Sequence, residues 1–283
     1  MRRAVMMFGE AKKAAPAEVP AIDGRLGAAK RLLERSDALL DTMNARDAAR
    51  PQPPPKVYFT KENLDAHKAW LARGKTGGGR LVLEDTSVGG LPLGNLNVQS
   101  ARLVKVSFRG SRVDFAHFED AELVECSAID TNFAHTIFDR AKLERCIFDR
   151  AGLVLTDFHD ARVTGGSFVD ATMDRSTWLR MIVADCDLHD ARFGDCVLDG
   201  TRFEGCNLRD ANLARKSTLP MCTTTNTTFV RCDLRGAKLA GRRFDRTSFI
   251  DCQLDGLDGK PDLVGPVTIQ GPGADALRAR WGL

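Results

Sequence analysis

The sequence repeats a large apolar residue every five positions, and this period constrains the fold more than any other feature. The large residues, mostly Phe, Leu and Val, recur from Leu83 to Leu213, with Ala128 as a weak member. A period of five matches neither the 3.6-residue turn of an α-helix nor the two-residue alternation of a strand. The chain must therefore turn within each unit, which predicts short straight sides joined by corners.

A small residue lies two positions before each large one. These small residues include Ala116, Ala121, Cys126, Thr131 and Thr136. The three remaining positions of each unit are mostly Asp, Arg, Gly, Glu or Asn, which suit corners and solvated faces. We therefore expect the large and small side chains to fill a narrow core inside a polar outer layer.

The phase of the repeat changes once, after Leu213. One extra residue before Leu219 accounts for the change, and the pattern then resumes and continues to Leu254. An inserted residue predicts a bulge at residues 214–216 that rotates the later units. Arg242 departs from the pattern and weakens its own unit.

The units also carry a recognisable consensus. Segments such as Ala211-Asn212-Leu213, Cys232-Asp233-Leu234 and Ala237-Lys238-Leu239 resemble the pentapeptide repeat family, whose motif is roughly A(D/N)LXX. The resemblance covers about residues 81–256. It implies an all-β solenoid: a right-handed quadrilateral β-helix with four pentapeptides per coil. With a strand spacing of about 4.8 Å, about nine coils are expected.

The region before the repeats has a different character. We expect a disordered arm over residues 1–23, then an amphipathic helix and a Pro-rich linker over residues 24–56, because leucines recur at helical spacing before a run of prolines. Residues 57–80 are expected to form a capping helix and a Gly-rich linker. The helix should run over residues 61–73, with Thr60 as its N-cap, and close the open first coil.

Prolines and glycines break the period after residue 256, so residues 257–283 are expected to form a short C-terminal cap. Residues 274–281 have the composition of a short helix. Two roles are open for its large side chains: capping the last coil, or forming a homodimer through Leu277 and Trp281.

No arrangement of residues typical of catalysis is present. The eight cysteines fall at the small inward position once the phase change is counted, which favours reduced thiols that fill space in the core. Four of them, Cys126, Cys146, Cys186 and Cys206, should stack on one face. Cys and His residues do not cluster at metal-ligand spacing, and no histidine lies beside a nucleophile. We expect a protein that is not an enzyme and has no cofactor, metal or small-molecule substrate.

Four successive units make one expected coil, so every fourth unit falls into a column that runs along the solenoid. One column places Phe115, His135 and Leu155 outward, with Val154 beside them. An exposed apolar patch on a charged surface needs a cover. Either the N-terminal region folds over this patch or a protein partner binds it.

Two other columns are charged. The first reads Asp120, Arg140, Asp160 and Arg180, a pattern that predicts a structural ladder of ion pairs. The second is an acidic stripe with one cation, Arg150, among its carboxylates, which are Asp130, Asp170, Asp190 and Asp210, with Asp187 close by. Like charges stacked in succession cost stability, so the stripe is either functional or a well-screened solvated edge.

Charge and hydropathy exclude some partners. The net charge is only +3, from 41 basic and 38 acidic residues, which gives no general argument for nucleic acid or an anionic membrane. The basic N-terminal residues precede only about five apolar residues, too few for a secretory signal, and no run approaches the roughly 18 residues of a membrane span. We therefore expect a cytoplasmic protein with no membrane contact.

Two functions remain as hypotheses. The first is a non-catalytic scaffold that presents a rigid solenoid surface to a protein partner. The second comes from the resemblance to the quinolone-resistance and albicidin-immunity members of the family, and is binding to DNA gyrase by DNA mimicry, which protects the topoisomerase against its poisons. Mimicry requires a strongly negative rod, whereas residues 101–256 carry 22 basic and 24 acidic residues. The scaffold is therefore preferred.

Overall fold

The computed structural model describes residues 59–214 and 223–283. By its internal contacts the chain divides into two units, residues 1–56 and 57–283. The arm expected over residues 1–23, the helix and linker expected over residues 24–56, and Leu219 and Cys222 lie outside the described residues.

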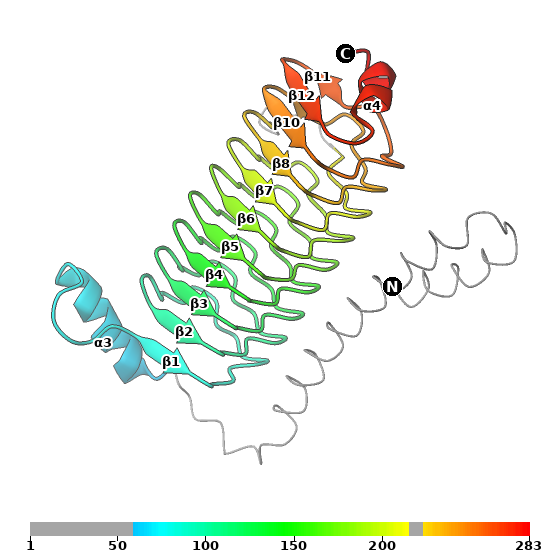
Figure 1. Ribbon diagram of the computed structural model, residues 1–283. Coiled ribbons are helices and arrows are strands. Elements are labelled where there is room, and N and C mark those ends of the chain that lie inside the picture. The colour runs from blue at the N-terminus through cyan, green and yellow to red at the C-terminus, as the bar shows by residue number, and fades with distance from the viewer. Residues whose placement is uncertain (1–58, 215–222) are drawn as a thin grey trace, which may run out of the picture. The chain divides into compact units, whose positions relative to one another are not determined.

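The second unit is a parallel β-solenoid of about nine turns, with one helix before the first coil in sequence and a short helix after the last (Figure 1). Ten short strands stack in chain order into one parallel sheet. They are β1 (Val82–Glu84), β2 (Arg102–Val104), β3 (Glu122–Val124), β4 (Lys142–Glu144), β5 (Arg162–Thr164), β6 (Ile182–Ala184), β7 (Arg202–Glu204), β8 (Thr228–Val230), β10 (Thr247–Ile250) and β12 (Val267–Gln270). A second sheet pairs β9 (Arg243–Phe244) with β11 (Asp262–Leu263).

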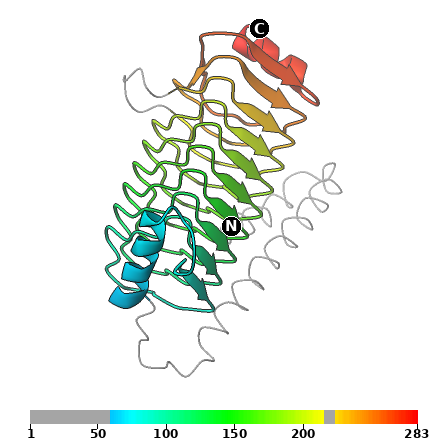
Figure 2. The same cartoon turned by 90° about the vertical axis from the view of Figure 1, so that its left-hand side faces the viewer.

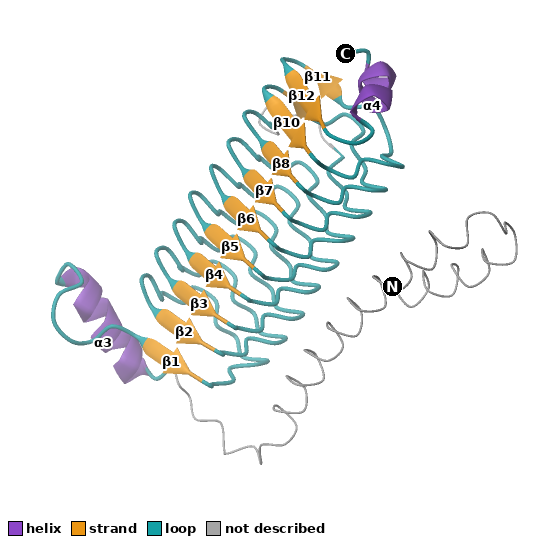
Figure 3. Cartoon of the chain, viewed as in Figure 1, coloured by secondary structure: helices purple, strands orange, loops and turns teal. Residues whose placement is uncertain are grey.

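The regular coils have a constant length of four five-residue units. Leu83 pairs with Leu103, and Leu103 with Leu123, at this spacing. The other three sides are held by isolated parallel bridges at the same spacing, such as the one between Ser107 and Ser127. Figure 3 shows the strands on one side and turns on the others. The five-residue unit is therefore one side and one corner, and the expected quadrilateral solenoid is confirmed.

The core consists of large side chains stacked coil upon coil. The rings of Phe138 and Phe158 are parallel, with centroids 5.0 Å apart, and Phe148 and Phe168 repeat this geometry. Between these stacks lie the small residues, many of which are polar. Their hydroxyl or thiol groups donate to a carbonyl of the preceding coil, as Thr131 Oγ1 does to Phe108 O at 2.8 Å. This bond removes the cost of burying the hydroxyl groups.

The seven described cysteines are all buried and free, in agreement with the inward positions expected from the sequence. Cys146 Sγ, for example, donates to Leu123 O at 3.5 Å. Burial raises the pKa of the Cys196 thiol to about 11, so this thiol stays protonated at neutral pH. Within the described part of the chain the cysteines therefore act as small core residues.

The irregular coil after Leu213 corrects the sequence analysis. Arg202 pairs with Thr228, whereas a coil of regular length would place its partner at position 222. Asn212 bridges to Lys238 with the same enlarged offset. Six extra residues are therefore accommodated between Leu213 and Thr224, whereas the sequence indicated one. Six and one change a five-residue phase equally, so the pattern alone cannot distinguish them.

Arg242 marks the coil that follows this insertion. Its side chain is fully buried at an inward position that is small elsewhere. Nη2 donates to Cys196 O at 2.9 Å and to Thr223 O at 3.4 Å, and Nε donates to Thr224 Oγ1 at 2.5 Å. The guanidinium thus joins the coil below the insertion to the residues that follow it.

The solenoid also extends further than the sequence indicated. Strand β12 pairs with β10 in register over its whole length, from Thr247 with Val267 to Ile250 with Gln270. The expected boundary at residue 256 is therefore wrong, because the backbone completes another coil although the five-residue pattern has ended. On a second side of this coil, Asp262 pairs with Arg243, one residue short of the regular spacing. This unequal spacing explains why the period is lost.

Helix α3 (Lys61–Ala72) lies beside the first coils of the solenoid (Figure 2). Thr60 is its N-cap and accepts from the Asn63 amide at 3.1 Å, which confirms the expected start. His67 and Trp70 are buried, and His67 Nδ1 accepts from the Leu81 amide at 3.0 Å. A helix side chain thus satisfies a backbone group of the first coil.

Helix α4 (Ala274–Trp281) closes the other end. Its Arg278 donates to the carbonyl of Ile269 in the terminal strand β12, and pairs with Asp275 at 2.7 Å. The outer edge of the terminal strand β12 is therefore engaged by a helical side chain, which limits edge-to-edge aggregation there.

Candidate protein-binding surface

The apolar column expected from the sequence is present on the surface. We use this name for Phe115, His135, Leu155 and Val154. Phe115 is 50% exposed and Leu155 38%, and Val154 is half-buried beside them. The rings of Phe115 and His135 are parallel within 2°, with centroids 4.6 Å apart. Consecutive coils therefore present one continuous aromatic and aliphatic strip to solvent.

The backbone of the apolar column makes its composition unusual. Phe115, His135 and Leu155 occupy corners with φ of 60°, 58° and 56°, the left-handed region. This region costs an L-residue roughly 1–2 kcal/mol, and Gly, Asn and Asp tolerate it best. Among the described non-glycine residues with positive φ, only Phe115 and Leu155 are apolar, and most of the rest are Asp or Arg. The sequence therefore keeps exposed apolar groups where neither burial nor backbone preference favours them.

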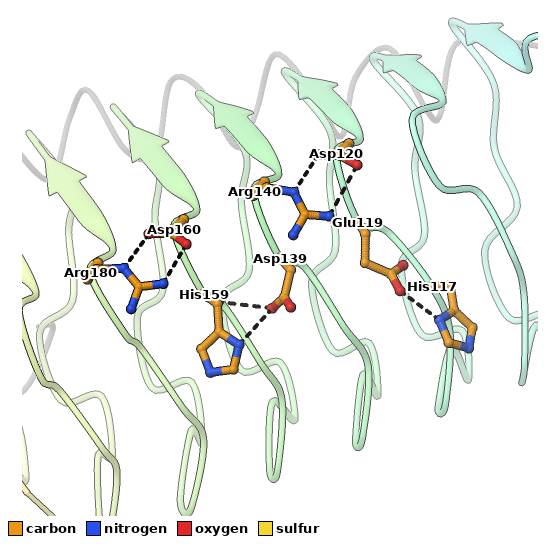
Figure 4. A network of polar contacts seen from close by, with 8 residues as sticks. All are labelled: His117, Glu119, Asp120, Asp139, Arg140, His159, Asp160 and Arg180. Carbon is orange, nitrogen blue, oxygen red and sulfur yellow. Dashed lines mark hydrogen bonds and ion pairs between the residues drawn. The ribbon is translucent and has the colours of Figure 1, made fainter. Parts of the chain in front are cut away.

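The next corner along the coil carries a network of ion pairs (Figure 4). Arg140 Nε and Nη2 contact the two carboxylate oxygens of Asp120 at 2.8 and 3.2 Å. Arg180 holds Asp160 in the same way, at 2.7 Å for both bonds. The arginine hydrogen bonds lower the pKa of Asp120 and of Asp160. These two bidentate pairs confirm the expected ladder as a structural feature.

Two histidines extend this network. His117 Nδ1 lies 3.0 Å from Glu119 Oε1, and His159 Nδ1 lies 3.4 Å from Asp139 Oδ1. Asp139 also accepts from the His159 amide at 3.1 Å. The carboxylates at this corner thus already have partners within the chain. The adjacent apolar column, in contrast, exposes apolar side chains to solvent.

The acidic stripe contains one internal ion pair. Asp130 is held by Arg150, with Nε to Oδ1 at 2.7 Å, which leaves Asp170, Asp190 and Asp210 as the run of like charge. Partial burial raises the pKa of Asp190; the charge of His189 opposes this effect, and the neighbouring Asp170 and Asp210 add to it.

Asp187 lies beside this run but is engaged by other side chains. Its Oδ1 contacts His189 Nδ1 and accepts from Asn207 Nδ2, both at 2.8 Å. Burial lowers the pKa of His189, but the hydrogen bond and charge of Asp187 outweigh it and leave the pKa raised. Asp187 thus acts with His189 and Asn207 as a local polar cluster.

One carboxylate with an unusual environment was not singled out in the sequence. Asp149 is buried, accepts from Ser167 Oγ, and accepts from the Val169 amide at 3.1 Å. Burial raises the pKa of its carboxyl group. Asp149 occupies a corner position like many other aspartates, so no sequence signal marks it.

The two residues considered for a dimer lie inside the C-terminal cap. Leu277 is 6% exposed and Trp281 2%, and the Trp281 ring packs 6.2 Å from Phe244 and 5.8 Å from Phe249. These contacts place both side chains in the capping role. Contact with a second copy through them requires α4 to leave the coil.

Metal-binding clusters and membrane-spanning helices are both absent from the described residues. Within residues 59–214 and 223–283, no group of three or more His, Cys, Asp or Glu residues is arranged to hold a metal ion. In the same part of the chain, neither helix has the length and apolar character needed to cross a membrane.

Comparison with known proteins identifies the repeats. The family model for pentapeptide repeats matches eight copies, over residues 129–165, 186–215 and 228–258. No curated protein sequence matches the chain.

Several solved structures similar to this chain are pentapeptide repeat proteins of low sequence identity. HetL, involved in heterocyst differentiation regulation in Nostoc sp. strain PCC 7120, is 17% identical, with 69% of this chain and 92% of HetL covered and a TM-score of 0.36. QnrB1, a plasmid-mediated fluoroquinolone resistance protein, is 16% identical, with 72% and 97% covered and a TM-score of 0.37. Rfr23 from Cyanothece 51142 is 12% identical, with 44% and 89% covered and a TM-score of 0.34.

The matched copies lie in the stretch where a large inward residue recurs every five positions and successive coils pair at a constant spacing. These matched segments of the chain are therefore pentapeptide repeats.

Proposed function

We propose that this protein is a non-catalytic scaffold that binds a protein partner through the apolar column. The observation that carries the proposal is the exposed stack of Phe115 on His135, continued by Leu155, at left-handed corners. The fold requires this backbone conformation at its corners but not apolar side chains there, and residues that strain the backbone cluster at functional sites. Aromatic residues at the centre of a patch are also the side chains that dominate protein interfaces.

Rigidity supports this role. The column rests on coils whose cores are stacked rings and whose corners are held by ion pairs, so its spacing is fixed before a partner binds. A preorganised surface avoids the entropy cost of ordering on binding. The buried free thiols also support a reducing compartment, and hence the cytoplasm, as the place of action.

The test is a double substitution of the patch. Phe115→Asp with Leu155→Asp removes its apolar character at two exposed corners, so the fold should be retained. The matched control is Val82→Asp, because Val82 is 49% exposed but lies outside the apolar column, on β1. Tagged wild type and both variants are crosslinked in cells of the native host, and the captured proteins are identified by mass spectrometry.

A partner retained by wild type and by Val82→Asp, but lost from the double variant, is the expected result. Identical partner lists for all three proteins would reject the apolar column as the binding surface.

Gyrase binding by DNA mimicry remains the second candidate, and the run of Asp170, Asp190 and Asp210 favours it. The run supplies one charge per coil, about 4.8 Å, whereas duplex DNA carries one per about 1.7 Å of axis. This density is too low for close mimicry, so we rank it below the scaffold. A gyrase supercoiling assay with a quinolone tests it: unchanged inhibition at micromolar protein eliminates this candidate.

A further inference from the structure

The last coil ends in a strand with one open edge. In β11 the Asp262 amide donates to Arg242 O at 2.8 Å and the Val264 amide to Phe244 O at 2.9 Å. Strand β11 pairs with β9 alone. Because backbone groups alternate in direction along a strand, the N–H and C=O of Leu263 point to the opposite edge. That edge presents a donor and an acceptor in strand geometry.

This edge differs from the end of the ten-stranded sheet. There, Arg278 of α4 donates to the Ile269 carbonyl and occupies the terminal edge of β12. Among residues 59–214 and 223–283 no side chain is bonded in this way to Leu263. The cap therefore closes one side of the last coil and leaves the other available.

A groove runs along the open edge. It has a volume of about 720 Å³ and is lined by residues 260–265 and 281–283. Val264 is 55% exposed and Leu283 51%, and they are two of only five large apolar residues exposed in the described chain. Apolar side chains thus flank the open backbone groups.

Trp281 adds an independent observation. Its side chain is 2% exposed and lines the groove, yet its indole Nε1 is buried without a hydrogen-bond partner in the described part of the chain. A buried donor without an acceptor is rare in folded proteins, because its lost hydration is not replaced. The wall of the groove therefore includes a residue with an unsatisfied hydrogen-bond donor.

We propose that this groove binds an extended peptide segment of another protein, which adds to β11 as a further strand. The peptide backbone would pair with Leu263, an apolar peptide side chain would lie against Val264 and Leu283, and a peptide carbonyl would accept from the Trp281 indole. Strand addition of this kind takes affinity from main-chain bonds and specificity from side-chain contacts. The site is separate from the apolar column and does not depend on its function.

The probe is a phage-displayed library of random dodecapeptides, selected on the full-length protein. The best binder is synthesised and measured by calorimetry. In the wild type, peptide binding should slow hydrogen exchange at the Leu263 amide. The substitution Val264→Lys should weaken binding about tenfold, which corresponds to about 1.4 kcal/mol. The control is Val82→Lys, which changes a similarly exposed valine at the far end of the solenoid and should leave affinity unchanged.

The substitution Trp281→Phe isolates the indole N–H, because phenylalanine preserves most of the packing on Phe244 and Phe249. We expect peptide affinity to fall several-fold while the melting temperature changes little. Phe115→Asp with Leu155→Asp should leave peptide affinity unchanged, which separates this proposal from the scaffold proposal.

Three results would overturn the proposal: selection yields no binder, the binder is insensitive to Val264→Lys, or the Leu263 amide gains no protection. Analytical ultracentrifugation of the protein alone decides the remaining alternative. A dimer in which Leu263 is protected without peptide would make a second copy the occupant and reject the peptide.

Discussion

Side chains at the corners of the solenoid are selected by backbone conformation as much as by solvent. A corner with φ near 60° favours residues that tolerate the left-handed region, and most of the corners carry Asp, Arg or Gly. Phe115 and Leu155, two coils apart in one column, contradict this preference. Folding does not explain them, so the conflict itself points to binding.

The conflict can be measured at Leu155. Leu155→Asn places a residue that tolerates the left-handed region at an exposed corner, so the free energy of unfolding should rise by up to about 1 kcal/mol. Leu153→Ala, two residues away at a fully buried position, should lower it by about 2–5 kcal/mol. Chemical denaturation of both variants and wild type gives the comparison. A clear loss of stability in Leu155→Asn would mean that Leu155 is held by contacts within the chain.

At this scale the sequence predicted much of the surface but not all of it. The five-residue phase shows that Phe115, His135 and Leu155 point outward and that the cysteines point inward, because direction follows from position in the unit. It does not distinguish the buried Asp149 from exposed corner aspartates, since that burial depends on Ser167 of the next coil. The unsatisfied indole of Trp281 likewise depends on how α4 lies on the last coil.

The two helices bond to the first and last coils of the solenoid. Helix α3 supplies His67 to the Leu81 amide, just before β1, and α4 supplies Arg278 to the Ile269 carbonyl of β12. Each helix is therefore attached to its coil by a polar side chain that bonds to backbone.

The hydrogen bond between His67 of α3 and the Leu81 amide should weaken in acid. Burial is the main cause that lowers the pKa of His67, so the unfolded chain binds a proton at a higher pH than the folded one. Stability is therefore retained above the ordinary value of about 6.5 and falls as the pH drops below it. Protonation also removes the lone pair on Nδ1 that accepts from Leu81. Hydrogen exchange at the Leu81 amide should accelerate between about pH 6.5 and 5, after correction for the intrinsic rate.

His67→Gln is the control for this effect, because glutamine keeps an acceptor oxygen but does not titrate. Its Leu81 exchange, corrected in the same way, should vary less with pH. An equal pH dependence in both proteins would exclude His67 as the titrating group.

The helices were predictable because their signals are local, whereas the end of the solenoid was not. Thr60 caps α3 and residues 274–281 form α4, both as the sequence indicated. The coil beyond residue 256 escaped detection because β12 pairs at the regular coil spacing and β11 one residue short of it, which no single period describes. Long-range pairing continues there without a local repeat.

The core of the unit formed by residues 57–283 depends on coil length, because the inward side chains of successive coils must stay aligned on all four sides. The coil after Arg202 is six residues longer than a regular one, yet the columns above and below remain aligned, as the parallel rings of Phe203 and Phe229 show. The core on either side of the insertion is therefore not shifted by the extra length. The sequence predicted the change of phase but could not give its size.

Removing the six residues from Arg215 to Pro220 should therefore restore a coil of regular length. The shortened coil keeps Cys222 and Thr224 in phase with the small and large inward positions, so we expect a folded protein with cooperative thermal unfolding. Circular dichroism and calorimetry measure this. Deletion of the same number of residues from Ala151 to Thr156, in a regular coil, should abolish cooperative unfolding. The hypothesis of a six-residue insertion fails if the first deletion is as damaging as the second.

The fixed coil height also limits what can lie along the apolar column. Coils are stacked about 4.8 Å apart, whereas a straight α-helix repeats every 5.4 Å. A helix lying along the column therefore falls out of step with the coils by about 0.6 Å per coil. From Phe115 to Leu155 the drift is about 1.2 Å, which side-chain rotation absorbs. Over five coils it reaches about 3 Å, more than half a step. A patch three coils long is thus close to the greatest length that an unbent helical ligand can follow, and a longer footprint would require the ligand to curve.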